Sequence, residues 1–395
     1  MTPRHRRIAI VESLGDLGIG TYTYELAEGL VEADCHVDVY GLPSSPIRDW
    51  PRHHAFRPEL PVIDAHTTRA VAWVQRRAKA TAFAISLARQ RYDWVWTQWP
   101  ALMGSTLFWR CARTAGIRVA HTVHNVLPHE RRPDDLKRLQ PVYSAAAALI
   151  VHSQQARATF ERAFPALARR VIVQPHGAYT CYPPASGDRA AVRARLDIAP
   201  NAIVLLSFGW VRPYKNVESL IRALADPSTL PVTLVIAGQE GGYPEPSPCA
   251  DDPLGRMRVL AEDVGVAHRV RFLPRFADAA ATSELLTAAD IVALPYFECS
   301  GSGQLLLAMT MGRYVLATAA GGMDEYLAQY PAHTLLRGTS PADVITGLRD
   351  AVERVACVGD GQRRVPGAFA WPQIAADTVR ALEVTSSSNG HRGHG

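Results

Sequence analysis

The sequence predicts an α/β protein of two domains, each with a parallel sheet between helices. Its 395 residues exceed what one hydrophobic core usually organises. Short apolar runs typical of buried strands alternate with helical segments in two successive series. A segment rich in Pro, Ala, Ser and Gly separates the series between Pro183 and Pro200. We therefore expect a first domain, a second domain, a last helix and a disordered tail over 1–185, 186–370, 371–385 and 386–395.

Composition narrows the class of protein. A hydrophobic content of 48% and a charged content of 20% fit a globular enzyme. No apolar run approaches the length of a membrane span, and the apolar piece after the basic N-terminus is too short for a signal peptide, so we expect a cytoplasmic location. The six cysteines are scattered without a CxxC pair, which disfavours a zinc knuckle or a disulfide framework. The net charge of +5 allows anionic substrates or a membrane surface and does not indicate nucleic acid.

The strand pattern indicates where ligands bind. In the first domain, strands are expected at 7–12, 36–40, 93–97, 118–123, 148–151 and 171–174, with a glycine loop at 15–20 and a helix at 22–33. In the second domain, strands are expected at 203–209, 232–237, 269–273, 291–294 and 314–317. The carboxyl ends of parallel strands share one edge of a sheet, and ligands bind in crevices there.

The run from Pro295 to Met309 has the features of an anion site. A buried strand leads into a short loop of serines and glycines, and a helix begins near Gln304. The first turn of a helix has free N–H groups and the positive end of the helix dipole, which favour phosphate. The loop supplies hydroxyl donors and glycines that allow close approach, namely Ser300, Gly301, Ser302 and Gly303. A plain strand–turn–helix corner is the alternative.

Two further loops carry candidate ligand-binding residues, and each follows the first expected strand of its domain. The loop 207–216 carries Arg212 and Lys215, whose charges suit a diphosphate, although a solvated basic loop is the alternative. The loop 15–20 carries Gly18 and Gly20, which fit either close ligand approach or a tight turn. That loop lacks the third glycine of a dinucleotide fingerprint, so a dehydrogenase is disfavoured.

Polar side chains are dense after the strand at 118–123. They are His124, Asn125, His129 and Glu130. The spacing is not that of a known zinc motif, so hydrogen bonding to a polyhydroxylated substrate fits better than metal binding. His152 and His176 also follow strands, and a purely structural role is the alternative for each histidine.

Two further observations concern partners. The chain has no Asp-x-Asp motif, which disfavours a sugar transferase that holds its nucleotide through a metal bridge. The stretch from Thr68 to Arg91 is basic and amphipathic. It is either a solvated helix packed on its own sheet or a helix that rests on an anionic membrane.

Taken together, these motifs resemble the retaining family 4 glycosyltransferases of the GT-B fold. The resemblance spans nearly the whole chain and includes Thr-Val-His124-Asn, Val-His152-Ser, Pro-His176-Gly, Phe-Gly-Trp-Val-Arg-Pro-Tyr-Lys215, the Ser-Gly run, Gly-Gly-Met-Asp-Glu325 and Phe369-Ala-Trp371. It implies two Rossmann-like domains that face a central cleft, with the last helix crossing back to the N-terminal domain.

The resemblance also implies roles for residues. His124, Arg212 and Lys215 would be catalytic, and no cofactor or metal would be required. Asn125, His129, Glu130 and His152 would bind the acceptor in the first domain. The nucleotide-sugar donor would be bound by Gly18, Gly20, Arg212, Lys215, Arg275, Phe276, Glu298, Ser300, Gly301, Ser302, Gly303, Gln304 and Glu325.

The sequence departs from the family pattern at two places. Many members carry two glutamates seven residues apart, and those positions are Cys299 and Leu307 here, with Glu298 one residue away. The usual arginine after Phe-Gly is Trp210, for which Arg212 is a substitute. This pattern is similar to a subgroup with Ser-Gly in place of the glutamates, which includes makers of exopolysaccharides and glycosylated antibiotics.

The expected activity is metal-independent transfer of a hexose-type sugar from a nucleotide-diphospho-sugar to an acceptor hydroxyl, with retention of configuration. Two alternatives stay open. A nucleotide-sugar epimerase of the same fold would need carboxylates or an acid/base pair, for which Glu130 and Glu298 are the candidates. A non-catalytic nucleotide-sugar binder is the second alternative, and the presence of Arg212, Lys215 and the Ser-Gly run disfavours it. The acceptor is expected to be a sugar, a lipid-linked intermediate or a natural product. Nucleic acid is not expected as a partner, and peripheral contact with the inner membrane surface is an open alternative.

Overall fold

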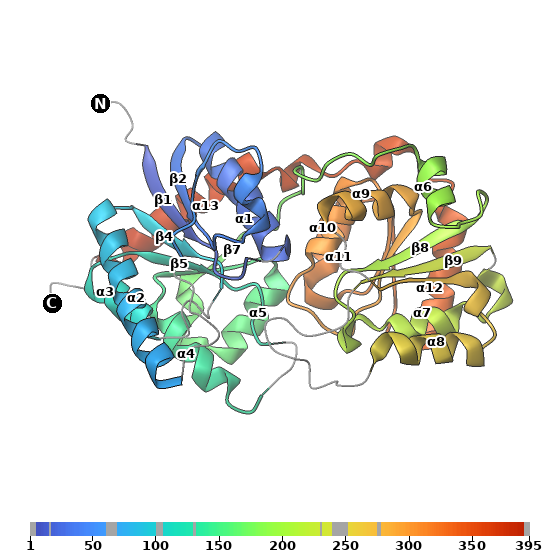
Figure 1. Ribbon diagram of the computed structural model, residues 1–395, viewed down its shortest axis with the longest axis horizontal. Helices are drawn as coiled ribbons and strands as arrows, with labels where there is room; N and C mark the ends of the chain where they lie inside the picture. The colour runs from blue at the N-terminus through green and yellow to red at the C-terminus, as the bar shows by residue number, and fades with distance from the viewer. Residues whose placement is uncertain are drawn as a thin grey trace. The chain divides into compact units, whose positions relative to one another are not determined.

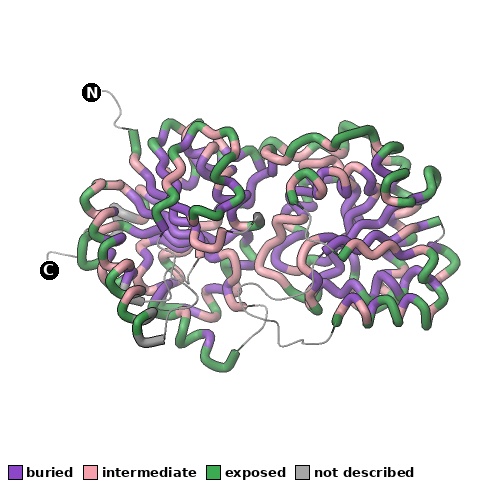
Figure 2. Tube along the Cα trace, viewed as in Figure 1, coloured by how far each residue is buried: buried purple, intermediate pink, exposed green. Residues whose placement is uncertain are grey.

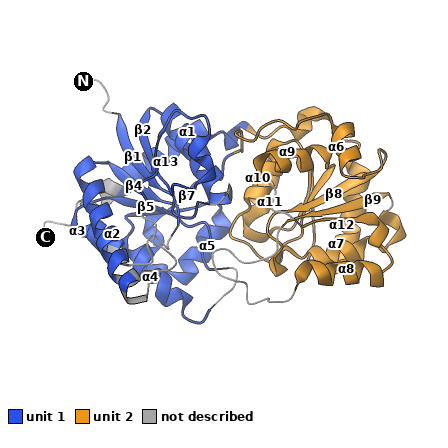
Figure 3. Ribbon diagram, in the orientation of Figure 1, with its two compact units in different colours: residues 1–177, 367–395 blue, residues 178–366 orange. Residues whose placement is uncertain are grey.

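The computed structural model of the protein describes residues 5–15, 17–60, 69–99, 106–128, 132–229, 231–238, 252–274 and 278–390. The chain divides into two compact units (Figure 3). The first unit comprises 1–177 and 367–395, and the second comprises 178–366. The changes of unit therefore fall at 177/178 and 366/367, where the sequence analysis expects 185/186 and 370/371.

The first unit contains a seven-stranded sheet in the order β3-β2-β1-β4-β5-β6-β7, and all of its strand pairs are parallel. Its strands are β1 (Arg6–Val11), β2 (Cys35–Tyr40), β3 (Ala55–Arg57), β4 (Trp94–Thr97), β5 (Val119–Thr122), β6 (Ala148–Val151) and β7 (Val171–Val173). The chain runs outward in one direction from β1 and in the other from β4. The strand order therefore reverses between β1 and β4, which is the usual place for a ligand in such sheets.

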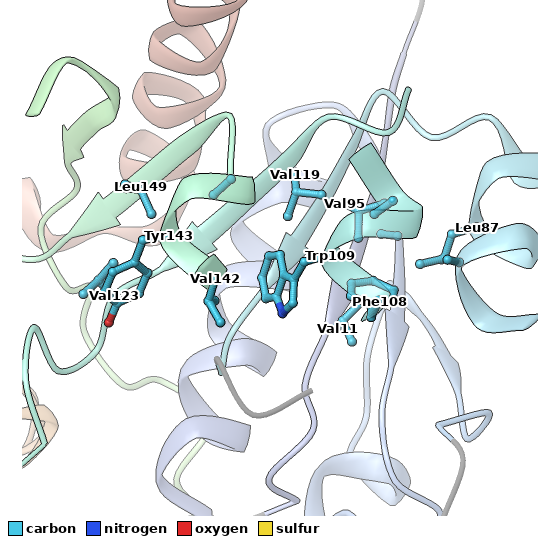
Figure 4. Close-up of a cluster of buried hydrophobic side chains, with 14 of the residues drawn as sticks. Val11, Leu87, Val95, Phe108, Trp109, Val119, Val123, Val142, Tyr143 and Leu149 are labelled. Carbon is cyan, nitrogen blue, oxygen red and sulfur yellow. The ribbon is translucent and has the colours of Figure 1, made fainter. Parts of the chain in front are cut away.

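Helices cover both faces of this sheet (Figure 1). They are α1 (Leu17–Glu32), α2 (Arg69–Gln90), α3 (Thr106–Thr114), α4 (Asp135–Ala145), α5 (Gln154–Ala163) and α13 (Trp371–Gly390). Successive strand residues point to opposite faces, so Val95 packs with α2 to α5 whereas Trp96 packs with α1 and α13. Figure 4 shows part of the hydrophobic cluster that contains Val95, including Phe108 and Trp109. In Figure 2 the central strands of each sheet are mostly buried, and the helices expose their outer sides.

The last helix belongs to the first unit, as the resemblance predicts. α13 packs beside α1, and its residues Trp371 and Leu382 are buried in the same core layer as α1. A Cβ at Gly177 would lie 2.4 Å from the Trp371 ring, and one at Gly29 would lie 2.8 Å from Trp371 Cβ. Two glycines therefore make room for this tryptophan. The helix continues to Gly390, whereas the sequence analysis expects a disordered tail from 386.

The second unit contains a six-stranded sheet in the order β10-β9-β8-β11-β12-β13, again with parallel pairs. Its strands are β8 (Ile203–Phe208), β9 (Val232–Ala237), β10 (Val270–Leu273), β11 (Ile291–Leu294), β12 (Tyr314–Ala317) and β13 (His333–Leu335). Its helices are α6 (Arg189–Arg195), α7 (Val217–Ala223), α8 (Pro253–Asp263), α9 (Ala279–Ala288), α10 (Gly303–Thr310), α11 (Met323–Leu327) and α12 (Pro341–Val355). Here the strand order reverses between β8 and β11.

Two strands are absent from the sequence analysis. β3 and β13 are each three residues long and lie at the edge of a sheet, where each pairs with one neighbour. Neither contains a run of apolar residues, so hydrophobic periodicity gives no signal for them.

The segment expected to link the domains is anchored to the second unit. Arg193 of α6 is buried, and its guanidinium donates to Asp290 at 2.6 Å and to the carbonyl oxygen of Ala288 at 3.1 Å. Asp290 also accepts a hydrogen bond from the Val204 backbone N–H at 2.7 Å. Because the buried charge of Arg193 is paired with the half-buried charge of Asp290, α6 is held against the start of β8.

Within the described residues, no helix combines the length and the apolar character needed to cross a membrane.

We predict that Gly177→Ala destabilises the protein, because its new methyl group would overlap the Trp371 ring. The expected loss in the free energy of unfolding is about 1–3 kcal/mol, as is usual when a packed core is overfilled. Urea denaturation measures it. Gly361→Ala is the control, since a Cβ there meets nothing within 4 Å. Equal effects of the two substitutions would contradict the tight packing of Trp371.

Candidate active site

The Ser-Gly loop leads into α10 as the sequence predicts. Ser302 is the N-cap residue, and its Oγ accepts a hydrogen bond from the Leu305 N–H at 3.2 Å. A Cβ at Gly303 would lie 2.7 Å from Tyr179 Oη, so a larger residue would displace the tyrosine or the helix. The hydroxyl of Ser302 thus fixes where the helix begins, while the rest of its first turn offers N–H groups to a ligand.

The loop after β8 meets α10 at one backbone oxygen. Lys215 Nζ donates to the carbonyl oxygen of Phe208 at 2.8 Å, and the side-chain amide of Gln304 donates to the same oxygen. Gly209 adopts a φ of +81°, and a Cβ there would lie 2.3 Å from Gln304 Nε2 and 3.2 Å from Lys215 Nζ. The lysine therefore lies at the amino end of α10. This point is where the strand order reverses between β8 and β11.

Lys215 is a buried cation in an unusual setting. Only 4% of the residue is exposed, and burial, followed by the charge of Arg212, lowers the pKa of its amine to about 7. Its Nζ lies 5.9 Å from the centre of the Tyr296 ring. No carboxylate among the described residues forms an ion pair with it. A buried ammonium of this kind is stabilised when an anion binds beside it.

The other predicted donor residues of the second unit differ in how far they are exposed. Glu298 is exposed, whereas Arg212, Ser300 and Gly301 are half-buried. Glu325 is half-buried in the first turn of α11.

Cys299, at the position of a family glutamate, is packed against the following loop. Its Sγ donates to the carbonyl oxygen of Ala320 at 3.3 Å, and a Cβ at Gly321 would lie 2.5 Å from that sulfur. Burial raises the pKa of the Cys299 thiol to about 12, so the thiol is neutral at pH 7. The side chain of Cys299 therefore carries no charge at a position where the resemblance implies a glutamate in many members.

The glycine loop of the first unit differs from its prediction. α1 begins at Leu17 and not near Tyr22, so Gly18 and Gly20 lie in the first turns of the helix. The turn itself is made by Gly15, which has a φ of +66°. The buried carboxylate of Glu12 accepts hydrogen bonds from the N–H groups of Leu14 at 2.7 Å and Gly15 at 3.0 Å. These bonds fix the backbone of 14–15, shortly before α1 begins.

Three predicted histidines of the first unit gather around Tyr22. The ring centre of Tyr22 lies 4.8 Å from that of His124, 5.2 Å from that of His152 and 5.0 Å from that of His176. The histidines follow β5, β6 and β7, so the carboxyl ends of three strands bring them together. Trp371 closes the group, with its ring centre 5.2 Å from that of Tyr22.

Burial keeps these imidazoles neutral. It is the largest cause in each case and lowers the pKa of His152 to about 4, that of His176 to about 3 and that of His124 well below its usual value. A neutral imidazole offers one donor and one acceptor nitrogen, which suits hydroxyl groups. The described residues contain no group of three or more His, Cys, Asp or Glu side chains arranged to hold a metal ion.

Two glutamines support the histidine group and are missing from the sequence analysis. Gln98 Oε1 lies 3.1 Å from His124 Nε2, and the carbonyl oxygen of Gln174 lies 3.1 Å from His152 Nδ1. Gln98 is fully buried, and its Nε2 makes no hydrogen bond within the described part of the chain. Each glutamine lies at the carboxyl end of a predicted strand, and this position is the feature of the sequence that could have identified it as a site residue.

Some predicted residues cannot be placed. His129, Glu130, Arg275 and Phe276 lie outside the described residues. Asn125 is half-buried in the loop after β5, where its carbonyl oxygen accepts a hydrogen bond from Tyr143 Oη at 3.4 Å.

Comparison with known families gives two matches. A model described as Glycosyltransferase Family 4 matches residues 18–180, and one described as Glycosyl transferases group 1 matches residues 202–356. A D-inositol 3-phosphate glycosyltransferase of Geodermatophilus obscurus is 26% identical over 94% of this chain and 86% of its own length. One of the same description from Corynebacterium glutamicum is 28% identical over 91% of this chain and 90% of its own.

Solved structures match across the whole fold. A glycosyltransferase from Rickettsia africae has a TM-score of 0.72 at 13% identity, covering 97% of this chain and 99% of its own. HepE from Anabaena in complex with UDP has a TM-score of 0.66 at 18% identity, covering 98% of this chain and 100% of its own. At these identities the likeness shows the GT-B fold.

We predict that Lys215→Met stabilises the ligand-free protein more at low pH than at high pH. In the unfolded chain the amine of Lys215 is protonated below about pH 10.5, whereas in the folded protein it is protonated only below about pH 7. The free energy of unfolding of the wild type should therefore rise with pH between these two values. The destabilisation caused by burying the charged Lys215 is complete below about pH 7. Urea denaturation near pH 6 and near pH 9.5 compares the two proteins, with the exposed Lys137→Met as control. A difference that is the same at both pH values would contradict the lowered pKa.

Proposed function

Because the chain belongs to family 4 of the GT-B glycosyltransferases, we propose that it transfers a hexose-type sugar from a nucleotide-diphospho-sugar to an acceptor hydroxyl with retention of configuration. One observation carries the proposal. The buried Lys215 lies at the amino end of α10, at the reversal of strand order, and has no carboxylate partner among the described residues. Such a site favours the diphosphate of a donor.

The donor would lie with its diphosphate against the first turn of α10. Helix N–H groups and the hydroxyl of Ser300 would donate hydrogen bonds, and Lys215 and Arg212 would supply two positive charges. Glu325 would contact the nucleotide–sugar end. HepE, which shares the fold, has been solved with UDP and with UDP-glucose, so uridine nucleotides are the first probes to use.

Transfer places charge on the leaving group. The bond between the anomeric carbon and the phosphate oxygen breaks, and a new bond forms from that carbon to the acceptor oxygen on the same face. The acceptor proton passes to the departing diphosphate oxygen. Lys215, Arg212 and the end of α10 would stabilise the negative charge that grows on the diphosphate. These fixed charges act where other transferases place a metal, so the proposal requires none.

The first unit would hold the hydroxyl groups of the substrates. The neutral imidazole of His124, oriented by Gln98, would contact the transferred sugar, and Asn125 and His152 would contact the acceptor. Relatives of this chain are described as D-inositol 3-phosphate glycosyltransferases. An inositol phosphate is therefore one member of the acceptor panel, beside sugars and lipid-linked sugars.

We predict that a thermal-shift screen of UDP, GDP, ADP, TDP and their sugars identifies the donor, because a ligand that binds the folded state raises its melting temperature. Lys215→Ala should abolish that shift and lower transfer by about 100-fold or more, as loss of a transition-state contact does. Lys137→Ala, which changes an exposed lysine, is the control. Near-normal transfer by a folded Lys215→Ala variant would refute the assigned role.

We further predict that the product keeps the anomeric configuration of the donor, because the acceptor attacks on the face from which the diphosphate leaves. Nuclear magnetic resonance of the purified product reads this configuration from the anomeric coupling constant. An inverted product would overturn the front-face mechanism.

The same assay separates the alternatives. A donor sugar converted into another without any acceptor would indicate an epimerase. Tight binding of the donor without turnover over the acceptor panel would indicate a binding protein.

A further inference from the structure

The solvent face of α2 is unusual for a surface helix. Val71, Val74 and Ile85 expose 48%, 58% and 45% of their surface. With the exposed Ala78 and Ala82 they form an apolar stripe, because at 3.6 residues per turn all five fall within about 80° around the axis. The opposite side of α2 is also apolar, since Ala80, Phe83, Ala84 and Leu87 are buried in the core. A surface helix ordinarily carries polar residues on its outer side.

The charged residues that α2 and α3 themselves carry are all positive. α2 contains no aspartate or glutamate. Helical geometry places Arg77 on one side of the stripe and Lys79 on the other, while the exposed Arg89 lies at its end. α3 packs beside α2 (Figure 1), also lacks acidic residues, and exposes Arg110 and Arg113. The outer face of α2 and α3 is therefore an apolar stripe within a field of cations.

We propose that this face of the first unit rests on an anionic lipid bilayer. The stripe would enter the boundary between head groups and acyl chains, with α2 parallel to the surface. The exposed Arg89, Arg110 and Arg113 would extend to lipid phosphates, with their aliphatic stems along the apolar layer.

Charge complementarity selects this occupant. A second copy of the same face would bring cation against cation, which disfavours a symmetric dimer through α2. A purely solvated helix would not need five apolar residues along its outer side. The proposal goes beyond the sugar transfer argued above and does not depend on it. It would place the enzyme where a lipid-linked acceptor is available.

Flotation of the full chain with vesicles tests the proposal. The chain should bind vesicles of phosphatidylglycerol and phosphatidylcholine, and not those of phosphatidylcholine alone. Added salt should weaken binding, because it screens the attraction to lipid phosphates. Val74→Glu with Ile85→Glu should weaken binding by about tenfold or more, since it places two charges in the apolar layer. Arg89→Gln with Arg113→Gln should weaken it by about tenfold.

Matched controls lie in the second unit. Val259 of α8 is 56% exposed and stands beside Arg258, but the last turn of α8 contains Glu262 and Asp263. Val259→Glu should leave vesicle binding unchanged, as should Arg349→Gln with Arg354→Gln on α12 (Arg354 pairs with Asp350).

Melting temperatures and transfer to a water-soluble acceptor should be unchanged in all variants, which separates lipid binding from folding and from catalysis. Three results would overturn the proposal. They are equal binding to neutral vesicles, equal effects of the Val259 and Val74/Ile85 substitutions, and a dimer in sedimentation that the Val74/Ile85 variant loses.

Discussion

The carbonyl oxygen of Phe208 accepts two hydrogen bonds, from Lys215 and from Gln304. These bonds hold the end of β8 against the start of α10, and Gly209 leaves the space that they require. The result is a cation buried at a helix N-terminus, a combination that favours an anion more than either feature alone. The donor side of the proposed reaction depends on this contact, because it orients both the helix and the lysine before any ligand binds.

In the first unit the candidate ligand-binding groups are uncharged. Three imidazoles from successive strand ends pack on Tyr22, and burial keeps them neutral. Trp371, from the far end of the chain, completes the group and is admitted by Gly29 and Gly177. Neutral donors and acceptors suit hydroxyls, whereas the charges of the second unit suit a diphosphate. In the proposed reaction, the second unit would bind the diphosphate of the donor, and the first unit would bind hydroxyl groups of the substrates.

The sequence analysis was most successful where local pattern and tertiary structure agree. The strands at 148–151, 232–237, 291–294 and 314–317 have the predicted bounds, because each is a mostly apolar run that is buried on both faces apart from the half-buried Thr233. It was less successful at the first glycine loop. The carboxylate of Glu12 fixes the backbone of 14–15, and α1 begins at Leu17 and includes Gly18 and Gly20. Gln98 was missed, because a buried glutamine has no motif and gains its meaning only from His124 beside it.

The sequence alone determined the α/β class, the two series of strands, the helix after the Ser-Gly loop and the polar residue types at strand ends, because these follow from local periodicity and turn chemistry. It also indicated the family through motifs spread along the chain. Only the tertiary structure decided which residues meet. Lys215 and Gln304 share one oxygen across distant segments, Trp371 packs on Tyr22, and the thiol of Cys299 is buried against Gly321. Such contacts depend on the order of strands in the sheets and on the space left by glycines. Neither can be read from the pattern of residues along the sequence.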